Sequence, residues 1–493
     1  MKGEVRKLGG AVLVYGLGEV LGRFVNFLLL PLYTSYLTPA DYGVAAILGV
    51  VTFLIRPLFS LGLETAMGIE YFQSEERRER ATVVWTAFTM LVVAAAIMLL
   101  GGWLLSDSVS RLAFHGDPQY GRLVAIAIAG SAANIAVQPL MQAVQFERKA
   151  TLYVVLTTVS TAISIGLSVL MVVGLHRGVA GWVEDDMLGR LVTLLMFAVP
   201  VLPRLAPVVR GAVGRQLLRL GLPLVPGFAF VFVLQQGNKY ILQWLDGLST
   251  VGIYNIGFNL GVAALGMPVA AFQRAWTPYF MEFVDRPADA AVVFRHVLTY
   301  YVFLFGGLSI AVMLVARPLI MILTQPAFHS AYLVLGFSAL AQCLYGMFYV
   351  LLPGAYFAKD VRFVTIMQAL AALITVVANV ILIRWLGLIG AGVGLVVGAA
   401  AQAALQHLRN TIVGHLPVRY EWGRIAGVAL AYAGYAFVAL WPRRLPLGVE
   451  ITISSAAVAT LIPLFLLMLR PEERDWLWRL ASRLRSRGGV AAA

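Results

Sequence analysis

Apolar segments long enough to cross a lipid bilayer follow one another along this chain and limit its fold more than any other feature. One helical crossing of the hydrocarbon core needs about 20 mostly apolar residues, and about fourteen segments meet that length. Charged residues or Gly and Pro clusters separate them. We therefore predict an all-α membrane protein with about 14 transmembrane helices. The segments cover residues 9–34, 41–68, 82–106, 120–144, 150–174, 178–203, 216–245, 250–276, 293–320, 329–353, 362–386, 388–408, 423–441 and 446–469.

The composition leaves little room for structure outside the membrane. Hydrophobic residues make up 60% of the 493 residues and charged residues only 12%, whereas roughly a quarter of the residues in soluble proteins are charged. The loops are too short to form a separate domain with an active site, and no Gly-x-x-x-x-Gly-Lys-Ser/Thr nucleotide loop is present. We expect a protein that is not an enzyme, with no catalytic residues and no cofactor.

The basic residues indicate how the chain is oriented. A net charge of +13 would suggest a nucleic-acid partner in a soluble chain, but here Arg and Lys lie mainly between apolar segments, where they set topology. They gather in every second loop and in the C-terminal tail, so the positive-inside rule places both termini in the cytoplasm. The first segment is too long for a signal-peptide core and is expected to be retained. We expect membrane lipids, and no nucleic acid, as partners of these basic surfaces.

The sequence also resembles itself. Glu147–Tyr153 is echoed by Ala358–Val364, and Leu37–Val44 is echoed by Leu245–Tyr254, both at a spacing of about 210 residues. This spacing predicts a tandem duplication into two six-helix lobes plus two C-terminal helices, with a substrate site near the bilayer midplane between the lobes. The predicted parts are an N-lobe at 1–210, a C-lobe at 211–410, the two added helices at 411–470 and a basic cytoplasmic tail at 471–493.

Polar residues within the apolar segments are the candidates for function, because a charge at the bilayer centre costs about 2.5 to 3.5 kcal/mol on insertion scales. In the first segment, Glu19, Arg23 and Asn26 share one helix face, and Arg23 lies about 21 Å along the span. The other candidates lie in the second, seventh and eighth segments: Arg56, Glu64, Gln236, Lys239, Asn255, Asn259 and Arg274.

Two interpretations of these residues stay open. The basic groups Arg23, Arg56, Lys239 and Arg274 form a wet cationic cavity that holds an anion, because a guanidinium fork matches phosphate oxygens. Alternatively, Glu19 pairs with Arg23 and Glu64 pairs with Arg56 between packed helices, and Arg274 is an interfacial anchor.

The acidic residues allow a second function. Glu19 and Glu64 are candidates for coupling transport to a proton or cation, as are Asp185 and Asp186 near the outer end of the sixth segment. A solvated acidic cluster is the alternative for the last two. The single Cys343 and the scattered His residues show no ligand spacing, so no metal site is expected.

Three motifs are similar to a known family of membrane proteins. Arg23–Gly43 resembles the first signature of polysaccharide biosynthesis membrane proteins, the Wzx-type flippases of lipid-linked oligosaccharides. Gly237–Leu242, Val251–Asn255 and Ala271–Pro278 resemble that family's seventh and eighth helices. Many relatives have Asp-Arg where this chain has Asn238-Lys239, so the cavity here would be more cationic. The superfamily also holds lipid II flippases and multidrug and toxin extruders.

The resemblance implies two six-helix lobes around a basic cavity and alternating access. It implies a substrate linked to undecaprenyl pyrophosphate, such as an O-antigen precursor of lipopolysaccharide, and a place in the bacterial inner membrane. Glycosyltransferases and a polymerase are the implied protein partners. A multidrug exporter and a noncatalytic scaffold for glycan synthesis are the alternatives, although a cationic drug would favour an acidic or aromatic cavity.

Overall fold

The computed structural model describes residues 28–74, 76–205, 207–358, 361–413, 416, 418–441 and 445–475. Within these ranges the regular secondary structure is entirely helical, which confirms the predicted all-α class. Thirteen helical segments of the described part are long and apolar enough to cross a membrane. Each coincides with one predicted segment from 41–68 onward, whereas most of the first predicted segment, 9–34, lies outside the described residues.

The described helices form two compact units. The first unit contains the described residues up to Ile256, together with Leu323–Ser330 and Gln368–Leu395. The second unit contains Gly257–Ile322, Ala331–Met367 and the described residues from Val396 onward. These units describe packing, whereas the predicted lobes describe a duplication of the sequence. The lobe boundaries at residues 210 and 410 therefore stay a prediction.

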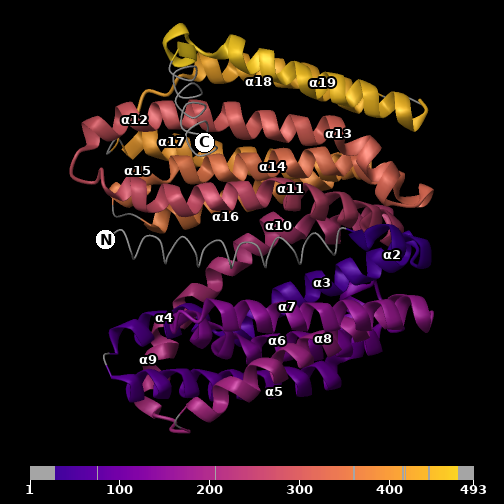
Figure 1. Cartoon of the computed structure of the whole chain (residues 1–493), viewed down its shortest axis with the longest axis vertical. Coiled ribbons are helices and arrows are strands. Elements are labelled where there is room, and N and C mark those ends of the chain that lie inside the picture. The colour runs from indigo at the N-terminus through magenta and orange to yellow at the C-terminus, as the bar shows by residue number, and fades with distance from the viewer. Residues whose placement is uncertain are drawn as a thin grey trace, which may run out of the picture. The chain divides into compact units, whose positions relative to one another are not determined.

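The first unit is a bundle in which α5, α6, α7 and α8 lie side by side (Figure 1). A short π-helix, η1, continues α7, and single 3₁₀ turns, η2 and η3, follow α8 and α9. The elements are α2 (Leu30–Tyr36), α3 (Pro39–Ser60), α4 (Leu63–Gln73), α5 (Arg77–Ala113), α6 (Gly121–Phe146), α7 (Ala150–Ser168), η1 (Val169–Gly174), α8 (Gly178–Val201), η2 (Leu202–Arg204), α9 (Gly211–Gly221), η3 (Leu222–Leu224) and α10 (Val225–Asp246).

Local sequence signals fix both ends of α3. Thr38 caps its start, because the Thr38 hydroxyl accepts from the backbone N–H of Asp41 at 3.2 Å while the Asp41 carboxylate accepts from the backbone N–H of Thr38 at 2.8 Å. Its end is marked by Leu61 and Gly62, whose φ angles of 53° and 67° lie in the left-handed region. The helix restarts at once as α4, so one membrane span contains a break.

The α3 and α10 helices run antiparallel. At one end of α3, a methyl group on Gly43 would overlap the carbonyl oxygen of Leu248, just after α10. At the other end, a methyl group on Gly62 would overlap the carbonyl oxygen of Gly221, just before α10. Glycine at these positions allows the two backbones to approach closely.

The second unit contains most of α11 (Leu248–Met281) and the helices that pack around it. Another π-helix, η4, joins α12 to α13. The elements are α12 (Pro287–Tyr301), η4 (Val302–Gly306), α13 (Gly307–Leu323), α14 (Tyr332–Leu351), α15 (Pro353–Phe357), α18 (Trp422–Leu440) and α19 (Leu447–Met468). The helices α16 (Val361–Leu386) and α17 (Leu388–Val413) each contribute residues to both units, and η5 (Pro326–Ala331) belongs mainly to the first.

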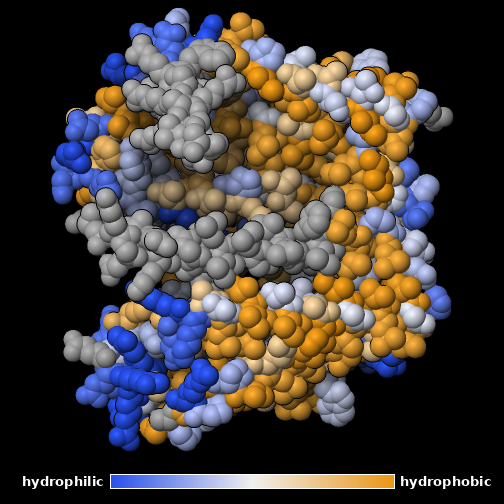
Figure 2. Space-filling model, in the orientation of Figure 1, coloured by the Kyte–Doolittle hydropathy of each residue, from blue (hydrophilic) through white to orange (hydrophobic). Residues whose placement is uncertain are grey.

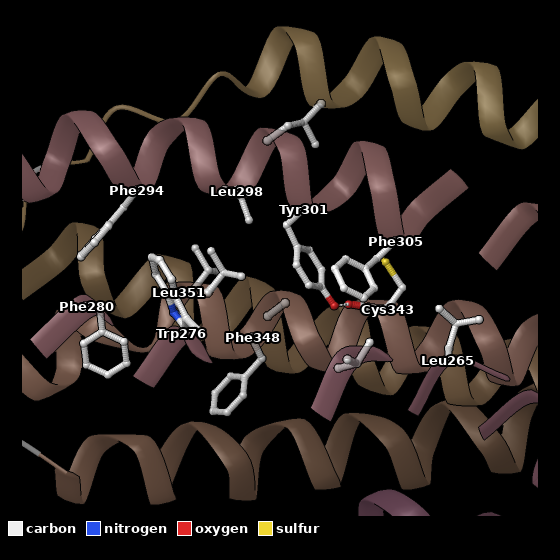
Figure 3. Packing of buried hydrophobic residues seen from close by; sticks show 14 of the residues in the cluster. Leu265, Trp276, Phe280, Phe294, Leu298, Tyr301, Phe305, Cys343, Phe348 and Leu351 are labelled. Carbon is white, nitrogen blue, oxygen red and sulfur yellow. Dashed lines mark hydrogen bonds between the residues drawn. The ribbon is translucent and has the colours of Figure 1, made fainter. Parts of the chain in front are cut away.

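An aromatic cluster forms the core of the second unit (Figure 3). Trp276 from α11, Phe294 and Tyr301 from α12 and Cys343 from α14 are all buried within it. The Tyr301 hydroxyl donates to the Cys343 carbonyl oxygen at 2.9 Å, and the Trp276 indole N–H donates to the Tyr349 carbonyl oxygen at 3.1 Å. Because these polar tips are satisfied, the rings can stay buried at depth in the membrane.

The surface of the first unit separates by polarity. Hydrophobic side chains cover the flank of α5, where Val93, Ile97, Leu100 and Leu104 are exposed, whereas hydrophilic side chains gather at the end of the unit where α4 and α9 lie (Figure 2). A flank of exposed aliphatic side chains beside a charged end is the pattern of a bundle standing in a bilayer.

Candidate functional site

Arg56 and Glu64 form an ion pair across the break between α3 and α4. An Arg56 guanidinium nitrogen, Nη2, lies 3.1 Å from Glu64 Oε1, and the two side chains are 37% and 33% exposed. The break at Leu61 and Gly62 makes this possible, because it redirects the chain between the two residues. The sequence left pairing and cavity binding open, and the structure pairs them. One bond occupies only part of the guanidinium, which carries five N–H donors.

Lys239 is the most deeply buried of the predicted basic residues that the structure describes. It lies in α10 and is 6% exposed. Its neighbour Asn238 is also buried and donates a hydrogen bond from its side-chain amide to the hydroxyl of Tyr254 in α11. Asn238 thus links α10 to α11 by donating a hydrogen bond. An ionised carboxylate at this position could link the two helices only by accepting one.

Arg56, Gln236 and Lys239 follow one seam between α3 and α10. The rings of Phe53 and Phe232 meet across this seam with centroids 6.2 Å apart. On α3, Arg56 lies three residues beyond Phe53. On α10, Gln236 and Lys239 lie four and seven residues beyond Phe232. These spacings place the polar residues on the same helix faces as the two rings, which face each other across the seam. Because the helices are antiparallel, the backbone positions of Arg56 and Lys239 lie about 15 Å apart along the helix axes. The seam is therefore an elongated row of polar groups.

The other predicted cavity residues lie on α11. Asn255 is half-buried and belongs to the first unit. Asn259 and Arg274 are exposed and belong to the second unit. Their membership of one binding site with Arg56 and Lys239 stays a prediction. Three further predicted residues, Glu19, Arg23 and Asn26, lie outside the described residues.

The acidic cluster on α8 consists of three carboxylates in different surroundings. Glu184 lies 2.8 Å from the Arg177 guanidinium and 3.7 Å from that of Arg122. Asp186 is exposed and pairs with Arg190 at 2.8 Å, one turn further along the helix. Asp185 points inward and is 7% exposed. The alternative of a merely solvated cluster therefore does not hold for Asp185.

Sequence reasoning missed a buried ion pair in the second unit. Arg317 of α13 lies 3.3 Å from Glu450 of α19, and the Glu450 side chain is 3% exposed. The sequence did contain an indication of this pair, because Arg317 is a charged residue inside the predicted span 293–320. Its partner could not be identified, since the two residues are far apart in sequence and only packing brings α19 against α13.

A second missed feature is the α18 charge network, defined here as Arg295, Glu421, Arg424, Arg470 and Glu473. Arg424 bonds to both Glu421 and Glu473 at 2.9 Å, and Arg470 bonds to Glu421 at 2.9 Å. Partial burial alone would raise the pKa of Glu473, but hydrogen bonds from Arg424, the Arg470 backbone and Tyr300 lower that pKa to about 2. The network links α12, α18 and the segment after α19.

Among the residues that the structure describes, no three His, Cys, Asp or Glu side chains gather as a metal site. Among the described residues, the aromatic core and the ion pairs stand out in the second unit, and the α3–α10 seam and Asp185 stand out in the first.

Comparison with known proteins identifies relatives of this chain. The model of the family described as "Polysaccharide biosynthesis protein" matches residues 8–284. This match covers α2–α11 and therefore the whole α3–α10 seam. No curated protein sequence matches the chain.

Solved structures of transporters share its fold. The lipid II flippase MurJ in an inward closed conformation aligns with a TM-score of 0.67 at 11% identity, over 92% of this chain and 98% of MurJ. An inward-facing MATE-family multidrug resistance transporter of the MOP superfamily aligns with a TM-score of 0.62 at 15% identity, over 85% and 99% of the two chains. The Vibrio cholerae MATE transporter VcmN aligns at 0.52 and 12% identity, over 88% and 97%.

Proposed function

Because the chain belongs to the polysaccharide biosynthesis protein family, we propose that it is a flippase that moves a lipid-linked oligosaccharide between the leaflets of a membrane. Its substrate is an undecaprenyl-pyrophosphate-linked oligosaccharide, such as an O-antigen precursor of lipopolysaccharide. It works by alternating access in the bacterial inner membrane, carries the substrate from the cytoplasmic to the outer leaflet and has both termini in the cytoplasm.

The row of basic groups along the α3–α10 seam is the observation that supports this proposal. Arg56 offers further N–H donors beside its bond to Glu64, and Lys239 lies about 15 Å further along the seam. A diphosphate joined to a sugar is long, anionic at one end and rich in hydroxyl groups along its length. Arg and Lys suit the phosphates, and Gln236 between them suits hydroxyl groups.

Burial of Lys239 fits alternating access. A lysine at 6% exposure inside a membrane span has lost most of its hydration, and ionisable residues inside membrane spans are typically functional. In the proposed cycle, α10 moves away from α3 and exposes Lys239 to the phosphate groups. Closing of the seam then displaces the ligand and buries the lysine again.

The proposed substrate determines which lipids and enzymes the protein works with. Membrane lipids surround the apolar flanks, and the lipid tail of the substrate stays among them. Glycosyltransferases must build the oligosaccharide on the cytoplasmic side, and a polymerase or ligase must use it on the other. These enzymes are the proposed neighbours of the protein in the membrane.

The decisive variant is Lys239→Met, which keeps the length of the side chain and removes its charge. In liposomes that contain the purified protein, a fluorescent undecaprenyl-pyrophosphate-linked sugar becomes accessible to a membrane-impermeant quencher as it is flipped. We expect Lys239→Met to reduce this rate at least tenfold, since one hydrogen bond to a charged group contributes about 1.5 to 3 kcal/mol. Lys239→Arg should retain most of the rate.

A matched control is Arg78→Ala, which removes one positive charge from the exposed start of α5. It should flip the substrate at the wild-type rate. Each variant must elute as a single folded species before its rate is compared. Wild-type rates for Lys239→Met would contradict the proposed role of the seam.

A further inference from the structure

Asp185 differs from the acidic residues on either side of it. Glu184 has two arginine partners and Asp186 has one, as described above. The Asp185 atom Oδ1 is buried and has no hydrogen-bond partner. An ionised carboxylate oxygen in this position would have lost its water without gaining a donor or a cation, which is strongly unfavourable in a low-dielectric interior.

Four elements of the first unit enclose Asp185 with polar and aromatic side chains. Ser168, the last residue of α7, lies against both the Asp185 carboxyl group and the Tyr33 hydroxyl of α2. Trp182, one turn before Asp185 on α8, stacks on Tyr33 with centroids 6.1 Å apart. Trp182 also meets Tyr42 of α3 edge-on at 4.7 Å. The Tyr42 hydroxyl, like Asp185 Oδ1, is buried without a hydrogen-bond partner.

The charged groups around Asp185 are already engaged with other residues. Arg177, just before α8, bonds to Glu184, and Arg190 on α8 bonds to Asp186, while Arg122 at the start of α6 lies 3.7 Å from Glu184. The titratable groups that act on Asp185 are Tyr33 on α2, a side-chain type that is neutral at physiological pH, and the neighbouring carboxylate of Asp186 on α8. Among the described residues, no arginine or lysine forms an ion pair with Asp185.

Asp185 lies near one end of α8. It lies seven residues after α8 begins at Gly178, which is about 10 Å into the span. Directly beyond Ser168, α7 becomes the π-helix η1. Such π-helical turns inside α-helices recur at functional sites.

We propose that Asp185 is a proton-binding site, and that the protein binds a proton on Asp185 Oδ1 in one state of its transport cycle and releases it in another. The inference rests on the proposed transport function. Uptake converts the carboxylate and one proton into a neutral carboxyl group, which needs no other reactant. A metal cation would need several oxygen ligands, whereas a proton needs the single free oxygen that Asp185 provides.

Infrared spectroscopy tests the site without any substrate. In lipid nanodiscs at mildly acidic pH, the wild type should show the C=O stretch of a protonated carboxyl group. Asp185→Asn should remove this band, and the matched variant Asp186→Asn should keep it. An identical band in wild type and Asp185→Asn would overturn the proposal. So would a band that appears only when choline replaces sodium ions, because the site would then hold sodium.

The flipping assay tests the link to transport. With the fluorescent undecaprenyl-linked sugar in liposomes, a pH gradient should accelerate flipping by the wild type and by Asp186→Asn but should leave Asp185→Asn unaffected. Equal acceleration of all three would overturn the coupling. If the wild type flips nothing, the proposed function fails, and the infrared band still decides whether Asp185 binds a proton.

Discussion

Charged side chains inside this protein are mostly neutralised by specific partners. Arg56 with Glu64 and Arg317 with Glu450 are pairs of this kind, and each joins residues on two different helices. The sequence predicted that Arg56 and Glu64 would either pair or line a cavity, and it named Asp185 as a candidate. It could not choose between the alternatives, because the choice depends on the break at Leu61 and on which neighbours already occupy each arginine.

The α18 charge network makes stability depend on pH. The folded pKa of Glu473, about 2, lies below the ordinary value of 4.5, so the folded state binds fewer protons than the unfolded state between these values. The stabilisation is complete above about pH 4.5 and is lost as the pH falls toward 2. Glu473→Gln should therefore lower the unfolding temperature at neutral pH, at a cost of about 1 to 3 kcal/mol.

The comparison is a thermal unfolding series in detergent from neutral to acidic pH. The difference between wild type and Glu473→Gln should shrink below about pH 4.5. Glu472→Gln, a change at the exposed neighbouring residue, should follow the wild type throughout. A constant difference at all pH values would show that Glu473 is not held ionised by its partners.

The Arg317–Glu450 pair gives a second test. Glu450→Leu leaves a charged arginine without its carboxylate partner and should destabilise the protein by about 3 to 5 kcal/mol. Replacing both residues, as in Arg317→Leu with Glu450→Leu, should recover most of that loss because no charge is then buried. A double-mutant cycle on unfolding temperature checks this, and additive effects of the single changes would contradict the pairing.

At the scale of helices, glycine determines where α3 meets its neighbours. A methyl group on Gly43 would overlap the Leu248 carbonyl oxygen, and one on Gly252 would overlap the Pro39 carbonyl oxygen. The contact is reciprocal, and its two glycines lie in Leu37–Val44 and Leu245–Tyr254, the segments that echo each other in sequence. The echo was visible in the sequence. That the two similar segments pack against each other was not visible, since similarity carries no information about contact.

Gly43→Ala tests this contact. The added methyl group has no space, so we expect a loss of about 1 to 3 kcal/mol in stability, the usual cost of overpacking. Gly49→Ala is the matched control on the same helix, because a methyl group there meets nothing within 4 Å. It should be neutral or stabilising, since alanine favours helix. Equal unfolding temperatures for the two variants would show that α3 and α11 are not in close contact at Gly43.

At the scale of the whole molecule, the bilayer makes the number of spans predictable. Its thickness sets a minimum length for each crossing, so hydropathy located every span from 41–68 onward, with ends within seven residues of the observed ones. Hydropathy could not predict which helices pack together in each of the two units. Residues of α16 and α17, for example, divide between the two units, and this division depends on side-chain packing, which hydropathy does not encode.

The class of substrate is the central claim that the proposed function adds to the family match and the fold. Both a lipid II flippase and multidrug transporters share this architecture, so the fold is compatible with either kind of substrate. The polar groups of the α3–α10 seam are basic or neutral apart from the paired Glu64. A seam of this kind should favour an anionic substrate and disfavour an organic cation.

A side-by-side transport measurement tests that claim most directly. Liposomes containing the wild-type protein are loaded in parallel with a fluorescent undecaprenyl-pyrophosphate-linked oligosaccharide and with a fluorescent organic cation such as ethidium. We predict protein-dependent flipping of the oligosaccharide lipid, lost in Lys239→Met, and no protein-dependent movement of the cation. Transport of the cation without movement of the oligosaccharide lipid would contradict the proposed function.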